Sequence, residues 1–580
     1  MRPSPLMLAL SLALLSGCQP AVRPEAQPAE AIVATPAPVL ESPSPGTMDS
    51  SYAGAAASAV AKQRSEQDRW SAARARLSAI APPPSPPAPY LAFAAQARSA
   101  PQANTERYAD FDDNPLRLAA EAPDSTFSVD VDTGSYSNVR RLLMSGQRPP
   151  ADAVRAEEMI NYFDYGHPAP ASRDQPFRVS TELAPAPWNP DRRLLQIGIQ
   201  GYRVEAKEMP AANLVFLIDT SGSMQDADKL PLLKRSFVEL VERLRPQDRV
   251  SIVVYAGSAG LVLAPTPGDR KKQILAALDR LEAGGSTNGG DGLRLAYATA
   301  RAALVPGGVN RVLLATDGDF NVGTVSQDAL ETLVSDQRKG GVALSTLGFG
   351  GGNYNDHLAE RLADLGNGNH AYIDSIDEAR KVLVEEASST LLTIASDVKI
   401  QVEFNPAVVA EYRLVGYENR ALRREDFNND AVDAGEIGAG HDVTALYELT
   451  LVGQPGASVD PLRYGKPDAA VAKTGELAWL RLRYKRPGET ASRLLESPVR
   501  LSQARSVASP ALRWSAAVAA YADLLRGGKH LHGFGWPQVR SLAEGAMGAE
   551  DRWGHRAQFL QLLDRASALT AGDPPVAVAE

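Results

Sequence analysis

The stretch that decides the fold is Asn213-Leu214-Val215-Phe216-Leu217-Ile218-Asp219-Thr220-Ser221-Gly222-Ser223. Its first part, Leu214 to Ile218, is a continuous apolar run without polar alternation. Such a run predicts a strand that is buried on both faces, as strands of parallel sheets are. The run ends at Asp219, so the predicted strand leads directly into a turn that carries one carboxylate and two serine hydroxyls.

Strands and helices are predicted to alternate along the chain after this first strand. The further strands are expected at 249–255, 311–315, 342–349 and 370–373. The helices are expected at 229–244, 270–281, 290–304, 327–339, 356–365 and 376–388. This alternation predicts an α/β fold with a doubly wound, mostly parallel sheet covered by helices on both faces. Ligand sites in such sheets lie at the carboxyl ends of the strands.

Oxygen-bearing side chains gather at the predicted carboxyl edge of this sheet. Asp219, Ser221 and Ser223 follow the first strand with a spacing of two residues. Thr287 ends the loop Gly284-Gly285-Ser286-Thr287 just before a helix, and Asp317 follows the strand Val312-Leu313-Leu314-Ala315. Carboxylate and hydroxyl oxygens are the ligands that Mg²⁺ prefers. The sequence therefore predicts a divalent-metal site at this edge.

The three pieces, in this order, resemble the von Willebrand factor type A (VWA, Rossmann-like) domain with its metal-ion-dependent adhesion site (MIDAS). The resemblance covers residues 211–395. It implies that the metal is held by Ser221, Ser223 and Thr287 directly or nearly so, and by Asp219 and Asp317 directly or through water. The cation is expected to be Mg²⁺, with Mn²⁺ or Ca²⁺ as alternatives, since all three take oxygen ligands.

The resemblance also implies a function in binding rather than in catalysis. An open position on the metal would accept an Asp or Glu carboxylate from a protein partner, for adhesion or scaffolding. One alternative is a structural protein whose metal site only stabilises the fold. The other alternative is a hydrolase or protease, which needs a nucleophile or general base near the metal, and the three loops contain no histidine. We therefore expect no enzyme activity.

Composition sets outer limits on the function. The chain has 580 residues, a formal net charge of −9 and one cysteine. An acidic balance argues against a dedicated nucleic-acid binder. A single cysteine excludes an internal disulfide framework and a cysteine-rich zinc site.

The N-terminus is predicted to be a lipoprotein signal peptide, residues 1–17. The apolar run Leu6–Leu15 is too short to span a membrane and has the length of a signal-peptide core. Leu15-Ser16-Gly17-Cys18 resembles the bacterial lipobox, which implies lipidation of Cys18. Residues 18–107, rich in Ala and Pro, are expected to form a disordered tether. We expect attachment to the bacterial cell envelope through the lipid alone. Gln19 favours the outer membrane, facing the periplasm or the cell surface.

The flanks of the metal-binding region are predicted to be three further parts. They are an N-terminal region at 108–205, a β-rich region at 397–500 and a helical end at 505–571. We expect the strands on both sides to join, so that the VWA domain is inserted into, or flanked by, a small β-sandwich. The flanking blocks resemble a bacterial subfamily labelled as calcium-activated chloride channel homologues. The sequence lends that label no support, because no second long apolar segment is present.

Four other motifs are interpreted as structural. Asp132-Thr133-Gly134-Ser135 resembles an aspartic protease loop but lacks the second Asp-Thr-Gly that this chemistry requires. The acid-rich segment 426–436 does not follow the EF-hand pattern and is expected to bond its own backbone. The pair His530 and His532 is expected at the surface, and the glycine-rich segment 348–352 is expected to be a flexible turn at the end of a strand.

Overall fold

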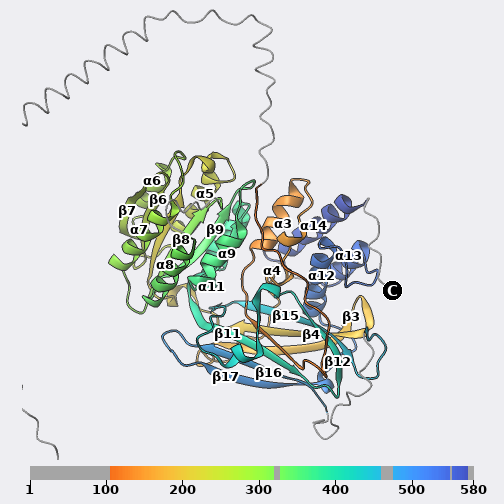
Figure 1. Ribbon diagram of the computed structural model, residues 1–580. Helices are drawn as coiled ribbons and strands as arrows, with labels where there is room; N and C mark the ends of the chain where they lie inside the picture. The colour runs from red at the N-terminus through yellow and green to blue at the C-terminus, as the bar shows by residue number, and fades with distance from the viewer. Residues whose placement is uncertain (1–104, 319–326, 459–474, 549–550, 572–580) are drawn as a thin grey trace, which may run out of the picture. The chain divides into compact units, whose positions relative to one another are not determined.

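The computed structural model describes residues 105–318, 327–458, 475–548 and 551–571 (Figure 1). The predicted signal peptide, the predicted lipidation site Cys18 and all but the end of the predicted tether lie outside the described residues. In the described part, no helix combines the length and the apolar character needed to cross a bilayer.

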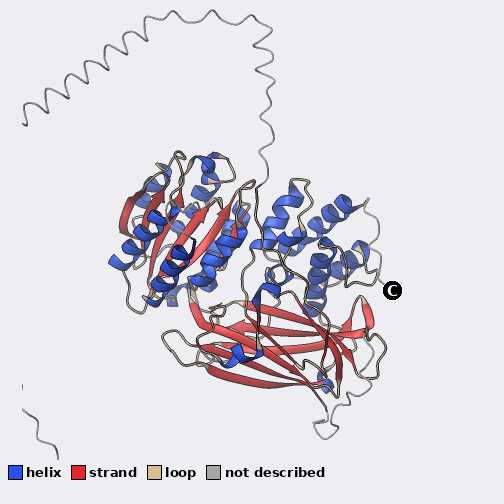
Figure 2. Ribbon diagram, in the orientation of Figure 1, coloured by secondary structure: helices blue, strands red, loops and turns tan. Residues whose placement is uncertain are grey.

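A six-stranded sheet forms the centre of the α/β domain (Figures 1 and 2). Its strand order is β10 (His370–Ile373), β9 (Ala343–Phe349), β8 (Val309–Thr316), β5 (Ala212–Asp219), β6 (Arg249–Tyr255) and β7 (Ala259–Pro267). All neighbours are parallel except β7, which pairs with β6 in the antiparallel sense. The predicted mostly parallel sheet is confirmed. The sequence analysis missed β7, an edge strand that contains two prolines and whose side chains are mostly exposed or half-buried.

Helices cover both faces of this sheet, as predicted. Leu214, Phe216 and Ile218 of β5 face a core shared with α5 (Leu230–Arg243) and α6 (Lys271–Asp279). Val215 and Leu217 face the opposite core. That core is completed by α7 (Gly289–Ala302), α8 (Gln327–Lys339) and α9 (Asp356–Leu365). A strand with apolar residues on both faces needs no alternation, which explains the continuous run from which the fold was predicted.

Two antiparallel sheets form the second part of the molecule (Figure 2). One has the order β1 (Arg117–Leu118), β12 (Val409–Val415), β15 (Asp442–Leu451), β4 (Asn189–Gly201) and β3 (Phe177–Ala186). The other has the order β13 (Ala421–Leu422), β2 (Asp124–Ser128), β11 (Thr393–Phe404), β16 (Glu476–Lys485) and β17 (Arg493–Arg500), with β14 (Ile437–Gly438) beside β11. Their inner faces share one core, so they form a sandwich.

Each sheet of the sandwich combines strands from before and after the parallel sheet. The chain leaves the sandwich at the end of β4 and returns to it at β11. The predicted joining of the two sets of strands is confirmed, and the parallel α/β domain is an insertion between them.

A fourth core is helical. The C-terminal helices α12 (Pro510–Leu525), α13 (Trp536–Glu544) and α14 (His555–Thr570) pack against α3 (Gly134–Met144) and α4 (Ala156–Asn161). Trp514 lies at its centre, with its ring 5.3 Å from those of Phe163 and Phe559. The helical end predicted from the sequence is therefore present, and it buries the N-terminal helices.

Two helical segments are interrupted. A short 3₁₀ turn (Ala151–Ala153) precedes α4, and Val154 and Arg155 between them are extended. The helix expected at 376–388 is divided into α10 (Ile376–Arg380), a π-helical turn (Lys381–Glu385) and α11 (Ala387–Leu391). In the first case the extended backbone places the Arg155 side chain in a buried ion network described below.

Candidate metal centre

The two predicted carboxylate ligands lie at the ends of neighbouring parallel strands. Asp219 is the last residue of β5, and Asp317 directly follows β8, whose Ala315 is paired with Ile218. Both carboxylates are fully buried, with 0% exposure. The Thr316 hydroxyl donates to Oδ2 of Asp219 over 3.3 Å and so orients this carboxylate.

The turn after β5 brings the serine hydroxyls together beside Asp219. The backbone N–H of Ser221 donates to Oδ1 of Asp219 over 2.8 Å, which closes the turn. The hydroxyl oxygens of Ser221 and Ser223 then lie 3.0 Å apart. Ser221 is buried and Ser223 is half-buried, so the hydroxyl pair lies between the interior and the solvent.

Thr287 is on a loop that is hydrogen bonded to this turn. Gly222 N–H donates to the carbonyl of Gly285 over 3.0 Å, and Gly284 N–H donates to the carbonyl of Thr220 over 2.8 Å. Thr287 itself is half-buried. The structure thus brings four of the predicted ligands into one cluster and places the fifth on an adjoining loop.

Burial governs the electrostatics of the centre. It raises the pKa of Asp219 to about 6; hydrogen bonds from Ser221 lower this pKa, and the neighbouring Asp317 raises it. The ionised form of Asp219 is therefore unfavourable in the metal-free protein. A dication would remove this cost, because an opposite charge favours the ionised carboxylate.

Lys229 is a part of the centre that the sequence analysis missed. Its ammonium donates to Oδ2 of Asp317 and to Oδ1 of Asn353, both over 3.0 Å. The residue is 5% exposed and immediately precedes α5. A positive charge is unfavourable at the N-terminus of a helix. A lysine at the predicted start of a helix could therefore have indicated from the sequence that Lys229 has another role.

The glycine-rich turn after β9 makes room for this lysine. Gly350 has a φ of +68°, and a side chain on it would collide with the aliphatic part of Lys229. The same loop is bound by the N-terminal segment. Thr105 N–H donates to the carbonyl of Gly352 over 2.8 Å, and Arg107 N–H donates to the carbonyl of Tyr354 over 2.9 Å. Residues 348 and 349 are the end of β9, so the turn begins at Gly350, and hydrogen bonds to the N-terminal segment hold it in place instead of leaving it flexible as predicted.

The donor set fits a hard divalent cation. Two buried carboxylates supply negative charge and the serine hydroxyls supply neutral oxygens, which is the chemistry that Mg²⁺, Mn²⁺ and Ca²⁺ share. Asp219, Ser221, Ser223, Thr287 and Asp317 are the residues that would hold it. When bound, the cation would offer a Lewis-acid position toward solvent, on the side of the half-buried Ser223 and Thr287.

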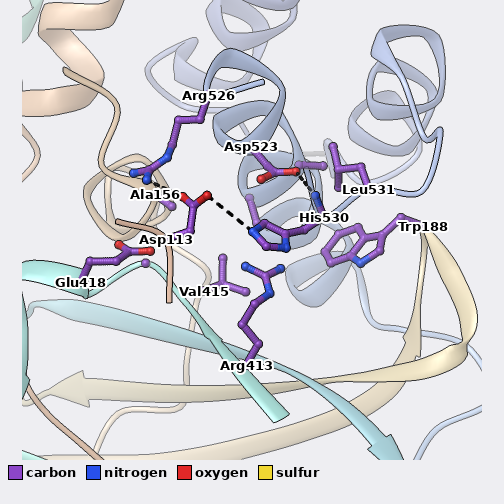
Figure 3. Close-up of a pocket in the computed structure, with 13 residues that line it drawn as sticks. Asp113, Ala156, Trp188, Arg413, Val415, Glu418, Asp523, Arg526, His530 and Leu531 are labelled. Carbon is purple, nitrogen blue, oxygen red and sulfur yellow. Dashed lines mark hydrogen bonds and ion pairs between the residues drawn. The ribbon is translucent and has the colours of Figure 1, made fainter. Parts of the chain in front are cut away.

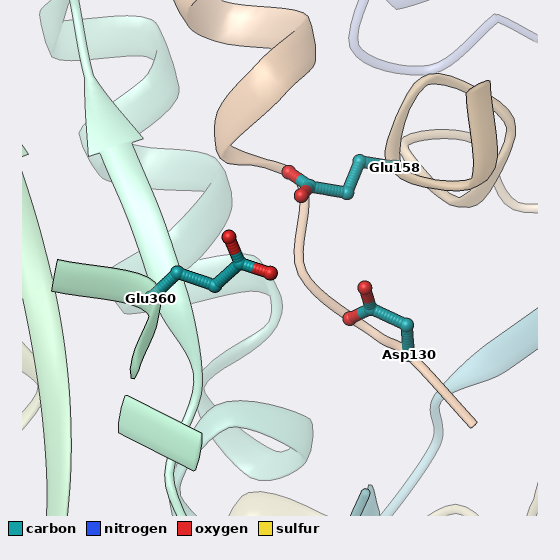
Figure 4. A group of neighbouring side chains, drawn as sticks. All are labelled: Asp130, Glu158 and Glu360. Atoms are coloured by element: carbon teal, nitrogen blue, oxygen red, sulfur yellow. The ribbon is translucent and has the colours of Figure 1, made fainter. Parts of the chain in front are cut away.

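A second acidic group, Asp130, Glu158 and Glu360, lies between the N-terminal region and α9 (Figure 4). Each of these buried carboxylates already has an arginine partner. Arg155 contacts Glu158, and Arg420 contacts Asp130 over 3.1 Å and Glu360 over 3.2 Å. We therefore interpret this group as an ion network that joins the inserted domain to its neighbours.

The remaining motifs are structural where the model describes them. Asp132 of the protease-like loop is buried and accepts a hydrogen bond from His370 N–H over 2.8 Å. In the segment 426–436, Asp426 accepts from Arg423 N–H and Asn429 accepts from Ala431 N–H, which confirms the predicted backbone bonding.

His530 differs from the prediction. It is half-buried at a cavity of about 30 Å³, and its Nε2 lies 3.6 Å from Asp113, an acid contributed by a distant part of the chain (Figure 3). Arg526 and Lys529 contact the same carboxylate, and with His530 they hold its pKa below the ordinary value. A cavity of this size has room for about one water and is too small for an organic ligand.

Comparison with known proteins agrees with this architecture. The family described as von Willebrand factor type A domain matches residues 213–385, von Willebrand factor matches 102–196, and "Uncharacterized protein YfbK, C-terminal" matches 389–569. The chain is 51% identical to YfbK of Escherichia coli K12 over 494 residues, which covers 83% of this chain and 85% of that protein.

More distant relatives are similar over smaller parts. Inter-alpha-trypsin inhibitor heavy chain H3 of Pongo abelii is 26% identical over 41% of this chain and 29% of its own length. Among solved structures, a von Willebrand factor type A protein from Catenulispora acidiphila is 14% identical, with a TM-score of 0.37, over 67% of this chain and 88% of its own. Proximal thread matrix protein 1 of the mussel byssus, with a zinc-occupied MIDAS motif, is 23% identical over 33% of this chain and 46% of its own, with a TM-score of 0.26.

The identity to the Escherichia coli protein extends over most of both chains. The chain belongs to the YfbK family and carries a VWA domain with a MIDAS-like arrangement, inserted into a β-sandwich.

Proposed function

We propose that the protein binds a divalent cation at Asp219, Ser221, Ser223, Thr287 and Asp317 and uses it to bind an Asp or Glu carboxylate of a protein partner. The observation that carries this proposal is the asymmetry of the centre. Its two carboxylates are fully buried, whereas Ser223 and Thr287 are half-buried. A cation held there would be bound by the buried carboxylates on its inner side and could accept a ligand on its solvent-facing side.

We propose binding rather than catalysis because of the side chains that contact the metal-binding residues Asp219 and Asp317. Lys229 is a basic group at the centre, but its ammonium donates to Asp317 and Asn353. A protonated amine in these two bonds has no lone pair with which to activate water. Thr316 also donates to a ligand, and its role is to orient Asp219.

The ligand function is tested by the double substitution Ser221→Ala and Ser223→Ala, with Thr332→Ala on the exposed surface of α8 as the matched hydroxyl control. We expect in-cell crosslinking to capture a partner set that disappears with EDTA and in the double variant but persists in the control. If the partners are unchanged and only the thermal stability falls, the metal site is structural and the proposal is wrong.

We further propose that the chain is lipidated at Cys18 and anchored to the cell envelope, at the outer membrane. The lipobox-like sequence before Cys18 supports this location. Two or three acyl chains would hold the protein stably, whereas one is marginal. We expect wild-type cells to incorporate labelled palmitate into the protein and Cys18→Ser cells to incorporate none. Absence of label in the wild type would refute the anchor.

A further inference from the structure

Lys229 places a fixed positive charge beside the metal-binding carboxylates. The contact between its ammonium and Oδ2 of Asp317 is 3.0 Å long, and the two side chains are 6% and 0% exposed. An ion pair so completely removed from water is little screened by salt. Its geometry is also fixed, because the ammonium of Lys229 donates a second hydrogen bond to Asn353. The aliphatic part of the lysine packs directly against Gly350, where a side chain would collide with it.

Among the residues that the structure describes, three neighbouring buried side chains carry charge at the centre. Asp219, Asp317 and Lys229 together carry one net negative charge when the carboxylates are ionised. A bound divalent cation changes this to one net positive charge. One incoming carboxylate then makes the centre neutral, which is the condition with the lowest electrostatic cost in a poorly solvated site.

We propose that Lys229 determines the specificity of the centre for an anionic ligand: it gives the metal-loaded site the positive charge that one carboxylate neutralises, at the expense of metal affinity. This inference rests on the proposed function. Without Lys229, the loaded site would already be neutral, so it would hold the cation more tightly and attract a carboxylate less.

The same contact limits how strongly Asp317 can bind the metal. The ammonium of Lys229 donates to Oδ2 of Asp317 and so draws electron density from this carboxylate, which weakens its binding of a cation. A weakly engaged Asp317 leaves more of the charge of the cation available to an outside ligand, which acts in the same direction as the ammonium.

The test uses the full chain in detergent, with Lys229→Met and Lys229→Gln. Methionine keeps the aliphatic part and removes both charge and donors, whereas glutamine removes the charge and keeps an N–H donor for Asp317. Lys272→Met on α6 is exposed and serves as the control with the same change in net charge. Asn353→Ala keeps the charge and removes one hydrogen bond to the ammonium.

Two affinities are measured for each variant. Free Mn²⁺ is followed by electron paramagnetic resonance. Binding of N-acetyl-glycyl-glutamyl-glycinamide to the Mn²⁺-loaded protein is followed by the loss of water-proton relaxivity, with the glutaminyl peptide as the neutral control.

We expect both Lys229 variants to bind Mn²⁺ about 3- to 10-fold more tightly and the glutamyl peptide about 10-fold more weakly, because a positive charge has been removed. Lys272→Met and Asn353→Ala should resemble the wild type in peptide affinity. If Lys229→Gln keeps wild-type affinities, or if both Lys229 variants bind Mn²⁺ more weakly, the lysine only positions Asp317 and the inference is wrong. If the wild type binds no glutamyl peptide, the proposed function is wrong, and the Mn²⁺ affinities still decide whether Lys229 sets the charge.

Discussion

Asp219→Asn is expected to abolish metal binding and at the same time to stabilise the metal-free protein at pH 8. The asparagine has nearly the same shape, and its carbonyl oxygen can still accept from the Ser221 N–H. What it removes is a buried negative charge that burial makes unfavourable. We expect Mn²⁺ affinity to fall by about 100-fold or more, since a hard cation loses one of its two carboxylates.

The stability gain should depend on pH in a defined direction. Because burial raises the pKa of Asp219 from 3.8 to about 6, the folded metal-free state binds more protons than the unfolded state between these values. The stability of the wild type therefore falls as the pH rises through this window, by about 3 kcal/mol at most. The asparagine variant has no such loss, so the two proteins should be equal near pH 4 and differ most above pH 7.

Urea unfolding with EDTA at several pH values measures this difference, and Mg²⁺ should reverse it. A cation at a hundred times its dissociation constant stabilises the wild type by about 2.7 kcal/mol. Asp291→Asn, which changes an exposed carboxylate on α7, is the control and should shift stability by less than about 0.5 kcal/mol. A variant that still binds Mn²⁺, or that is less stable than the wild type at pH 8, contradicts the prediction.

Arg155→Leu is expected to destabilise the protein by about 3–5 kcal/mol, because it leaves buried carboxylates without their partner. Arg155 is 1% exposed; it contacts Glu158, and its Nη1 lies 2.5 Å from Asp356 and 3.6 Å from Glu360. Burial raises the pKa of Asp356, but Arg155 and His370 outweigh burial and hold this pKa below its ordinary value. Without Arg155, the negative charge of Asp356 would be buried with less compensation, which lowers the free energy of unfolding.

The loss should be smaller at pH 5 than at pH 8. Burial raises the pKa of Glu158 to about 7 even with Arg155 present, so this carboxyl takes up a proton as the pH falls. A neutral Glu158 has no charge for Arg155 to compensate, so removing the arginine costs less stability when Glu158 is protonated. Arg173→Leu, at an exposed ion pair with Glu208, is the matched control and should cost at most about 1 kcal/mol. Equal losses for the two variants would show that the network does not hold the domains together.

Most of the fold could be predicted because its strongest signals are local. The run Leu214–Ile218 is apolar since β5 is buried on both faces, and Asp219 and Asp317 follow strands that pair directly. By contrast, β7 and β17 are edge strands with largely exposed side chains, so no periodic pattern marks them.

The parts that the sequence did not reveal depend on contacts between distant residues. His370 binds Asp132 across 238 residues, and Lys229 meets Asn353 across 124. Neither pair has a spacing that a pattern could detect. Thr287 differs from these pairs, because the resemblance to the VWA domain identified it from the sequence. In the structure, its loop is hydrogen bonded to the turn after β5.

The attachment of the N-terminal segment to the loop after β9 has a mechanical consequence. The described chain begins at Thr105, whose N–H is bonded to Gly352, and Arg107 is bonded to Tyr354. Asn353 lies between these two anchor points and holds Lys229. In a protein tethered at Cys18 and bound to a partner through the metal, tension between the two attachments runs through this loop. Part of the load would then be borne beside the metal centre, before the chain enters the β-sandwich at β1.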